Sequence, residues 1–326
     1  MPTEAFRSLD TVADDIARKL PSDIPLHGLL AADLLLKKTS KPTPWNAMFP
    51  SMTDFEATMP LMWPEELSIL LPKPAKDLRE KQRAKFRHEW NIVAKAFPEI
   101  SQEEYLYFWL VLNTRTFYYV TPEMERFLPE DRLALLPVAD LFNHADSGCE
   151  VLFSSKSFII VTNRAYRAGE EVLVCYGQQS NDWLLAEFGF MLTKNRWDEV
   201  CLDEVILPNL DVVQKAELEN RDYLGNYMLN VETGVCYRTQ VVLRLLCCTP
   251  REWCAFVDGK DDGEASQRMV DSLLIQILER FQGNIRETLT TLEKVNVGLG
   301  TQRELLTRRW KQIESVVVQS IKRLKV

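Results

Sequence analysis

Asp140-Leu-Phe-Asn-His-Ala145 and, further along, Gly169-Glu-Glu-Val-Leu-Val-Cys-Tyr-Gly177 are the stretches that decide the fold of this chain. The second stretch is a short apolar run after a glycine, which predicts a turn and then a strand ending on Tyr176. Taken singly, these residues have ordinary structural roles. Asn143 suits a turn or a cap, His144 suits a satisfied core position, and Tyr176 suits the rim of a core. Only their combination points to a site.

Short strands and one helix surround these stretches. Glu150-Val-Leu-Phe153 and Phe158-Ile-Ile-Val-Thr162 predict two paired strands around the turn Ser154-Ser-Lys-Ser157. The segment from Ser180 to Phe190 predicts a short helix, with Ser180 or Asn181 as its cap.

The sequence before residue 130 predicts helices and irregular structure. Leu26 to Leu36 is rich in Leu and Ala and predicts a helix, residues 41–82 carry most of the prolines and predict short helices, and residues 76–97 predict a charged helix. Ser101 and Glu104 form a capping-box pattern before Tyr105-Leu-Tyr-Phe-Trp-Leu-Val-Leu112. That helix is apolar on most faces, so we expect it to be buried.

Beyond about residue 200 the periodicity is that of amphipathic helices. Val270 to Phe281 and Leu306 to Leu324 each carry apolar residues at three-four spacing, with Gly298-Leu-Gly300 between them. We interpret that Gly-x-Gly as an interhelix turn. The pattern predicts an all-helical C-terminal domain.

Four strings together resemble one known family. They are Pro137-Val-Ala-Asp-Leu-Phe-Asn-His144, the Gly169-Glu-Glu…Tyr176 run, Asn113-Thr-Arg-Thr-Phe117 and Ser180-Asn-Asp-Trp-Leu-Leu-Ala-Glu-Phe-Gly-Phe190. They resemble the C-terminal half of a SET domain, the catalytic fold of protein-lysine methyltransferases. The branch they resemble includes the Rubisco large-subunit methyltransferase. The resemblance implies an α+β fold: a partial SET domain of short β-strands with a helical insertion, then an all-α substrate-binding-like domain.

The resemblance also implies a domain order. Residues 1–40 correspond to the segment after the family's Gly-x-Gly loop and the first insert helix, and 41–130 to the helical SET insertion. Residues 131–195 correspond to the C-terminal half of the SET domain, and 200–326 to the helical substrate-binding-like domain. The resemblance therefore begins inside the SET domain, and we expect its N-terminal strands, with their close-approaching glycines, to be missing. Their sheet partners would then have an unpaired edge.

Tyr176 matches the family's catalytic tyrosine, whose hydroxyl orients the substrate amine near the reacting methyl group. Asn143 and His144 match the pair that binds S-adenosylmethionine. Because methyl transfer to an amine needs positioning more than covalent help, a shaped, shielded pocket is what such residues must build.

Three further residues match family positions. Arg115 would reach the cofactor carboxylate or the substrate site, and its alternative role is a solvated arginine at a helix end. Phe188 would lie against the cofactor adenine or else be an ordinary core residue. Asp140 would lie near the substrate lysine or else form a salt bridge or helix cap.

Composition excludes several other classes. A net charge of -8 argues against a nucleic-acid-binding protein. Seven cysteines without a CxxC pair and only three histidines, His27, His88 and His144, predict reduced thiols and no metal site. No apolar run has the length of a membrane span. We therefore expect a cytoplasmic or nuclear protein.

Two functions of different class follow. The first is an S-adenosylmethionine-dependent protein-lysine N-methyltransferase acting on a non-histone protein such as a ribosomal or translation component, with histidine as a variant target. The second is a catalytically inactive, SET-derived protein-binding module.

Overall fold

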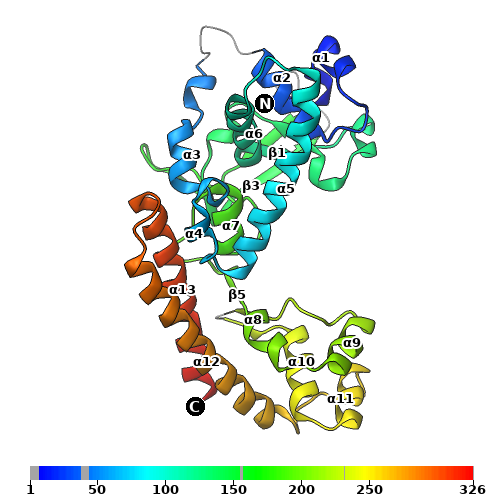
Figure 1. Ribbon diagram of the computed structural model, residues 1–326, viewed down its shortest axis with the longest axis vertical. Coiled ribbons are helices and arrows are strands. Elements are labelled where there is room, and N and C mark those ends of the chain that lie inside the picture. Colours follow the sequence, from blue (N-terminus) through cyan, green and yellow to red (C-terminus); the bar gives the residue numbers. More distant parts are fainter. Residues whose placement is uncertain (1–6, 38–43, 155–156, 231, 326) are drawn as a thin grey trace. The chain divides into compact units, whose positions relative to one another are not determined.

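The computed structural model describes residues 7–37, 44–154, 157–230 and 232–325. The chain divides into two compact units that interleave along the sequence (Figure 1). Unit 1 comprises Met1–Met62, Asp77–Gln179 and Trp183–Leu192, and unit 2 comprises Trp63–Lys76, Ser180–Asp182 and Thr193–Val326. The four consecutive domains that the resemblance implies stay a prediction, since these units are discontinuous in sequence.

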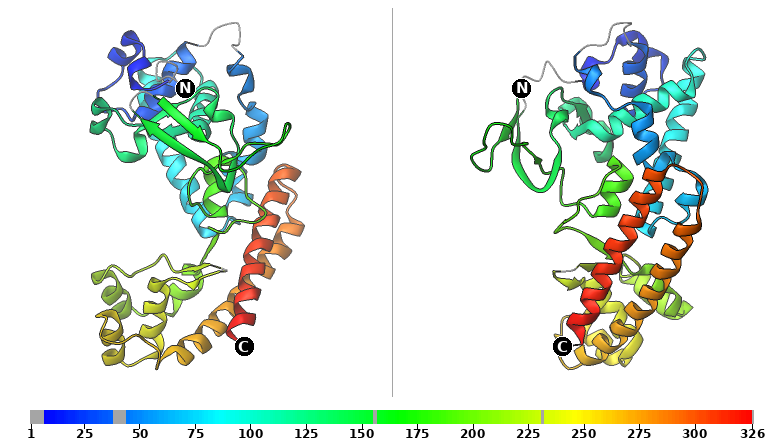
Figure 2. Two further views of the ribbon diagram at one scale, coloured as in Figure 1. Left: turned by 180° about the vertical axis from the view of Figure 1, so that it is seen from behind. Right: turned by 90° about the vertical axis from the view of Figure 1, so that its left-hand side faces the viewer.

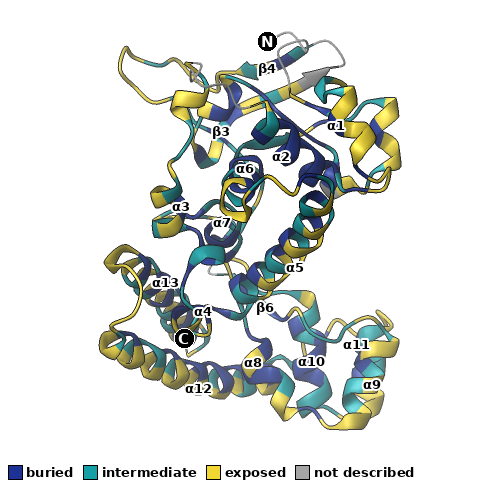
Figure 3. Ribbon diagram, turned by 45° about the horizontal axis from the view of Figure 1, so that its top comes forward, coloured by how far each residue is buried: buried dark blue, intermediate teal, exposed yellow. Residues whose placement is uncertain are grey.

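The core of unit 1 is helical. α2 (Leu26–Leu36) packs against α6 (Gln102–Arg115), while α1 (Asp14–Lys19) and α5 (Lys73–Ala96) lie nearby. α2 is apolar on nearly every side, so almost all of it is buried, as Figure 3 shows by its dark blue colour. Its bounds are those that the sequence predicted.

α6 begins where the capping pattern placed it. The Ser101 hydroxyl accepts a hydrogen bond from the Glu104 backbone N–H at 3.2 Å, which satisfies one of the helix's free donors. Tyr105 and the run from Phe108 to Leu112 are buried, which confirms the prediction of a buried helix. The helix ends at Arg115, and the chain then enters β1.

Short elements connect these helices. They include α3 (Met52–Thr58) and the 3-10 turns η2 (Leu9–Thr11), η3 (Asn46–Met48), η4 (Pro60–Met62), η5 (Pro122–Arg126), η6 (Pro129–Asp131) and η7 (Ala139–Leu141). The proline-rich region from 44 to 82 thus consists of short helices leading into α5, as predicted. Residues 41–43 of that region lie outside the described residues.

Unit 1 contains two small antiparallel sheets. β1 (Thr116–Tyr118) pairs with β2 (Leu133–Leu135). β3 (His144–Ser154) pairs with β4 (Ser157–Val161), with Glu150 opposite Val161, so the predicted hairpin is confirmed (Figure 2). The middle of its predicted turn, at positions 155 and 156, lies outside the described residues.

The segment from Glu171 to Tyr176 is not the regular strand that the sequence predicted. It is extended, and only Val174 forms bridges, one to His144 and one to Cys149. The backbone N–H of Val174 donates to the Asn143 carbonyl at 2.9 Å, and the N–H of Cys149 donates to the Leu173 carbonyl at 2.7 Å. Because the start of β3 brackets Val174 from both sides, the segment has no continuous partner along which a ladder could form.

After Tyr176 the chain enters α7 (Asn181–Phe188), which confirms the predicted short helix. Unit 2 continues with α8 (Asp203–Ile206), η8 (Leu207–Asn209), α9 (Val212–Asn220), α10 (Tyr237–Cys247), α11 (Pro250–Val257), α12 (Gln267–Lys294) and α13 (Gly300–Leu324), and it includes α4 (Glu65–Ser68). α12 and α13 pack against each other through the predicted apolar stripes.

Unit 2 is mostly helical, but it also contains a three-stranded sheet where the sequence predicted helices alone. Its strands are β5 (Glu199–Cys201), β6 (Met228–Asn230) and β7 (Gly234–Val235), in the order β5-β6-β7. Strands of two or three residues are too short to produce a recognisable alternation. Gly298 lies between α12 and α13 with a positive φ of 73°, which confirms the interhelix turn.

A buried ion cluster holds unit 2 together. Arg309 of α13 donates from Nε to Asp182 Oδ1 and from Nη1 to Asp198 Oδ2, both at 2.7 Å, and its side chain is fully buried. Two carboxylates around one guanidinium satisfy charges that would be costly to bury alone. Among the described residues, no helix is both long and apolar enough to cross a membrane.

Candidate active site

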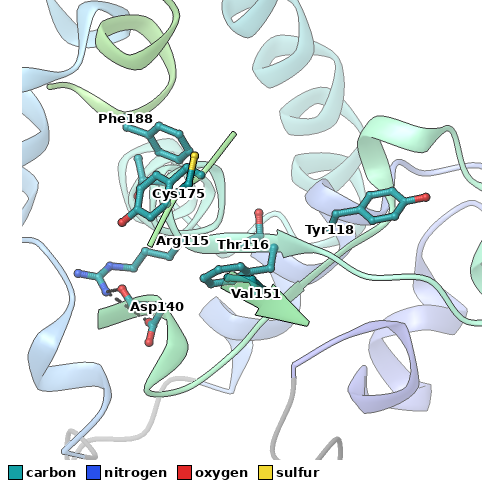
Figure 4. A pocket seen from close by; sticks show the side chains of 10 residues that line it. Arg115, Thr116, Tyr118, Asp140, Val151, Cys175 and Phe188 are labelled. Atoms are coloured by element: carbon teal, nitrogen blue, oxygen red, sulfur yellow. Dashed lines mark hydrogen bonds and ion pairs between the residues drawn. The ribbon is translucent and has the colours of Figure 1, made fainter. Parts of the chain in front are cut away.

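A cavity of about 170 Å³ in unit 1 collects four of the six predicted site residues: Arg115, Asp140, Tyr176 and Phe188. They come from the end of α6, from η7, from the extended segment and from the end of α7. Figure 4 shows Arg115 and Asp140 pointing toward one another, with Phe188 beside Cys175. The remaining lining residues are Thr114, Thr116, Phe117, Tyr118, Val151 and Cys175.

Arg115 and Asp140 form an ion pair in one wall of the cavity. Arg115 Nη1 donates to the Asp140 carbonyl at 3.0 Å and to Asp140 Oδ2 at 3.3 Å, and Nη2 donates to the Met48 carbonyl at 3.1 Å. The structure thus shows the salt bridge considered as an alternative for Asp140. Two buried polar atoms of this pair, Arg115 Nε and Asp140 Oδ1, have no partner among the described residues. Such atoms are costly unless a ligand or water satisfies them.

Tyr176 presents its hydroxyl with a defined direction. The O–H donates to the Phe142 carbonyl at 2.5 Å. Burial raises the pKa of Tyr176 to about 12, with a further upward contribution from Asp140 and a downward one from Arg115. The hydroxyl is therefore protonated at neutral pH, and because its proton is engaged by Phe142, its oxygen lone pairs are free to accept. This tyrosine can orient an amine but does not act as a base.

His144 supports Tyr176 from behind. The Tyr176 backbone N–H donates to His144 Nδ1 at 3.0 Å, and the two ring centroids are 5.0 Å apart. Because Nδ1 accepts, we assign the ring proton to Nε2. That Nε2 is buried and has no partner among the described residues. Burial is the main cause of a lowered His144 pKa, so the ring is neutral near pH 7.

Asn143 is not brought to the cavity. Its side chain is exposed, and Nδ2 donates to Glu171 Oε1 at 2.6 Å. Its carbonyl holds Val174 in place, so its visible role here is to anchor the extended segment that carries Tyr176. Its assignment to cofactor binding stays a prediction.

The structure adds residues that no motif singled out. Trp45 Nε1 donates to Asp140 Oδ2 at 2.9 Å across 95 positions of sequence. Phe190 packs near both His144 and Tyr176, at 6.0 and 6.4 Å between ring centroids. Phe190 stands in the quoted string of α7 and could have been found there, but a single tryptophan in a proline-rich segment carries no comparable signal.

The site residues fit part of a sulfonium cofactor and its substrate amine. Three observations carry this: the unpartnered donors Arg115 Nε and His144 Nε2, the unpartnered acceptor Asp140 Oδ1, and the Phe188 ring, 5.1 Å from that of Tyr176. The cavity itself is smaller than the roughly 300–1,000 Å³ of typical small-molecule sites. A second hollow in unit 1, of about 610 Å³, shares Thr116, Phe117, Tyr118 and Phe188 with it.

Across the part of the chain that the structure describes, no group of three or more His, Cys, Asp or Glu side chains is arranged to hold a metal ion. All seven cysteines are free thiols.

Comparison with known proteins gives concordant matches. Residues 198–323 match the family described as the ribosomal lysine N-methyltransferase 2 C-terminal domain. The ribosomal lysine N-methyltransferase set11 of Schizosaccharomyces pombe is 27% identical over 63% of this chain and 55% of its own length. The human SET domain-containing protein 4 is 27% identical over 82% of this chain and 66% of its own length.

The fold matches as well. The SET domain of LSMT, crystallised with lysine and AdoHcy, superposes with a TM-score of 0.59 at 15% identity, covering 99% of this chain and 80% of that one. The fold is therefore that of a SET-domain protein with helical regions. In sequence the chain is similar to SET-domain proteins, among them ribosomal lysine N-methyltransferases. The chain spans about half the length of the first of these relatives.

Proposed function

We propose that this protein is an S-adenosylmethionine-dependent protein-lysine N-methyltransferase. The observation that carries the proposal is the convergence of Tyr176, Asp140, Arg115 and Phe188, from four separate elements, on one cavity. The substrate we favour is a non-histone protein such as a ribosomal component, because matched relatives bear the name ribosomal lysine N-methyltransferase. A cytoplasmic or nuclear location would suit such a substrate.

The cavity has the chemistry that a lysine side chain requires. Its walls include Val151, Phe117 and Phe188, which suit the apolar stem, and its polar end carries Asp140 and the Tyr176 oxygen. The Asp140 Oδ1 atom would accept from the substrate nitrogen as it enters. A desolvated channel disfavours the charged ammonium, so the amine reaches the reacting position in its neutral form.

Tyr176 would then fix the direction of the amine. With its proton held by Phe142, the hydroxyl oxygen accepts an N–H from the amine, which directs the nitrogen lone pair away from the tyrosine. When bound, S-adenosylmethionine supplies an electrophilic methyl group on a positively charged sulfur. Arg115 Nε and His144 Nε2 are the free donors that would hold its polar groups, and Phe188 offers an aromatic face.

A second function has specific support. The Asn143 side chain lies outside the cavity, and a cavity of about 170 Å³ does not enclose a whole nucleoside cofactor. A catalytically inactive, SET-derived module that binds a protein through residues 200–326 would have these features. Cofactor binding separates the two functions.

A methylation assay tests the proposed activity. The purified chain would be incubated with S-adenosylmethionine carrying a labelled methyl group and with ribosomal proteins from cells lacking the endogenous activity. We expect label on lysine in at least one protein, and its loss with Tyr176→Phe. A matched control is Tyr237→Phe, which changes an exposed tyrosine of α10 that is not among the residues lining the cavity. Transfer that survives Tyr176→Phe unchanged would refute the assignment of Tyr176, and no transfer to any protein would favour the inactive module.

A further inference from the structure

Residues 45–49 form a short strap beside the cavity, built around η3 (Asn46–Met48). Trp45 donates from its indole N–H to Asp140 Oδ2, and the Met48 carbonyl accepts from Arg115 Nη2. Arg115 Cζ lies 5.7 Å from the centroid of the Phe49 ring. The Phe49 ring also packs edge-on against the Trp45 ring, with 5.1 Å between the two ring centroids. Three residues of the strap thus contact one ion pair.

The strap is only partly buried. Asn46, Ala47 and Met48 are exposed, with Met48 56% exposed, and neither Trp45 nor Phe49 is fully buried. Trp45 and Phe49 pack against the core of unit 1. The strap combines this packing with polar contacts to the Arg115–Asp140 ion pair.

The contact with Trp45 also decides how Asp140 presents its carboxylate. Oδ2 accepts from both Trp45 and Arg115, whereas Oδ1 is buried without a partner among the described residues. The Asp140 side chain is fully buried, so its orientation depends on these two donors. Without Trp45, the carboxylate could rotate about the Cβ–Cγ bond, and either oxygen could then occupy the position of Oδ1.

We propose that Trp45 is a positioning residue of the substrate site: its indole N–H holds Asp140 so that Oδ1 is the oxygen offered to the incoming basic side chain. This inference rests on the proposed function for its role in turnover. The structural part of the inference, that Trp45 orients Asp140, does not depend on the proposed function. A hydrogen bond to a charged group is among the stronger ones in proteins, and its loss corresponds to about a tenfold to hundredfold weaker interaction.

The coupling is tested first by NMR on protein labelled with ¹⁵N at tryptophan. Trp45→Phe identifies the Trp45 indole signal by its disappearance. We expect Asp140→Asn to move that signal and to leave that of Trp90, a partly buried tryptophan of α5, in place. Should Asp140→Asn fail to fold, exchange of the same indole proton with solvent in the parent decides. Exchange as fast as that of a free indole, or a signal unmoved by Asp140→Asn, would overturn the inference.

The role in turnover is tested by kinetics. Trp45→Phe keeps an aromatic ring and removes the donor, so we expect the KM for the protein substrate to rise about tenfold to a hundredfold, with the KM for the cofactor unchanged. Trp45→His restores a ring N–H and should recover part of the loss, and Trp90→Phe is the control. Equal KM values for Trp45→Phe and parent would refute the role of Trp45. A parent without any activity would refute the proposed function, and the NMR result would still decide the coupling.

Discussion

Gly148 permits the crossing that brings Tyr176 to the cavity, and Gly148→Ala should disrupt it. A Cβ atom at this position would lie 2.5 Å from the Val174 carbonyl carbon, 2.6 Å from its Cα and 2.7 Å from the Leu173 oxygen. Ordinary contacts between carbon atoms are about 3.5–4.0 Å, so the two backbones must separate by about 1 Å. The obstacle is backbone rather than a flexible side chain, so local rotation cannot relieve it.

The cost of this separation follows from the contacts that it strains. Overpacking typically costs about 1–3 kcal/mol. The two backbone hydrogen bonds that bracket Val174 contribute about 1 kcal/mol each, and both would lengthen. We therefore expect Gly148→Ala to lower the free energy of unfolding by about 2–4 kcal/mol. Because Tyr176 is two residues beyond Val174, a 1 Å displacement should also lower the methylation rate about a hundredfold.

Chemical denaturation followed by circular dichroism measures the first effect, and the methylation assay measures the second. Gly283→Ala is the matched control: Gly283 lies inside α12 with no atom within 4 Å of an added Cβ. In a helix that change should be neutral or stabilise by about 0.5–1 kcal/mol. A Gly148→Ala protein with the stability and activity of the parent would refute the account of how Tyr176 is positioned.

Three further predictions follow from the same structure. Arg309→Met should destabilise the protein by about 3–5 kcal/mol in denaturant, because it leaves Asp182 and Asp198 buried without their cation. Burial lowers the pKa of His144, so its contribution to stability is complete above pH 6.5 and is lost as the pH falls; a His144→Gln variant should show a shallower decline in unfolding free energy from pH 7 to pH 5. Tyr176→Phe should change stability by no more than about 1 kcal/mol, since it removes one hydrogen bond, while the methylation rate falls about a hundredfold.

Each of these has a matched control and an outcome that contradicts it. Arg286→Met breaks an exposed pair and should cost at most about 1 kcal/mol, so equal losses for Arg286 and Arg309 would contradict the importance of burial. His88→Gln, which changes an exposed histidine, is the matched control for His144→Gln. An unaltered pH dependence in His144→Gln, or a large loss of stability in Tyr176→Phe, would show that the site is held together differently.

The sequence predicted the elements whose pattern is local. α2 was predicted with its bounds because eleven consecutive positions are almost uniformly apolar, and α6 because Ser101 caps it. The hairpin of β3 and β4 followed from two short runs of strand-forming residues on either side of a polar turn. The cavity residues followed from motif spacing, since the resemblance carries long-range information that no periodicity contains.

What the sequence missed depends on tertiary contacts. The segment before Tyr176 looks like a strand, yet only Val174 finds partners because β3 bends around it. The contact between Trp45 and Asp140 joins residues far apart in sequence and has no local signature. The direction of the Asn143 side chain is set by Glu171, which the motif alone does not reveal.

Calorimetric titration of S-adenosylhomocysteine into the purified chain tests the central claim most directly. An S-adenosylmethionine-dependent enzyme should bind this product at micromolar strength or better. Binding should weaken with His144→Gln, which alters the unpartnered Nε2, and should persist with His88→Gln. No binding to protein shown by circular dichroism to be folded would contradict the proposed activity and leave the protein-binding module as the function of this chain.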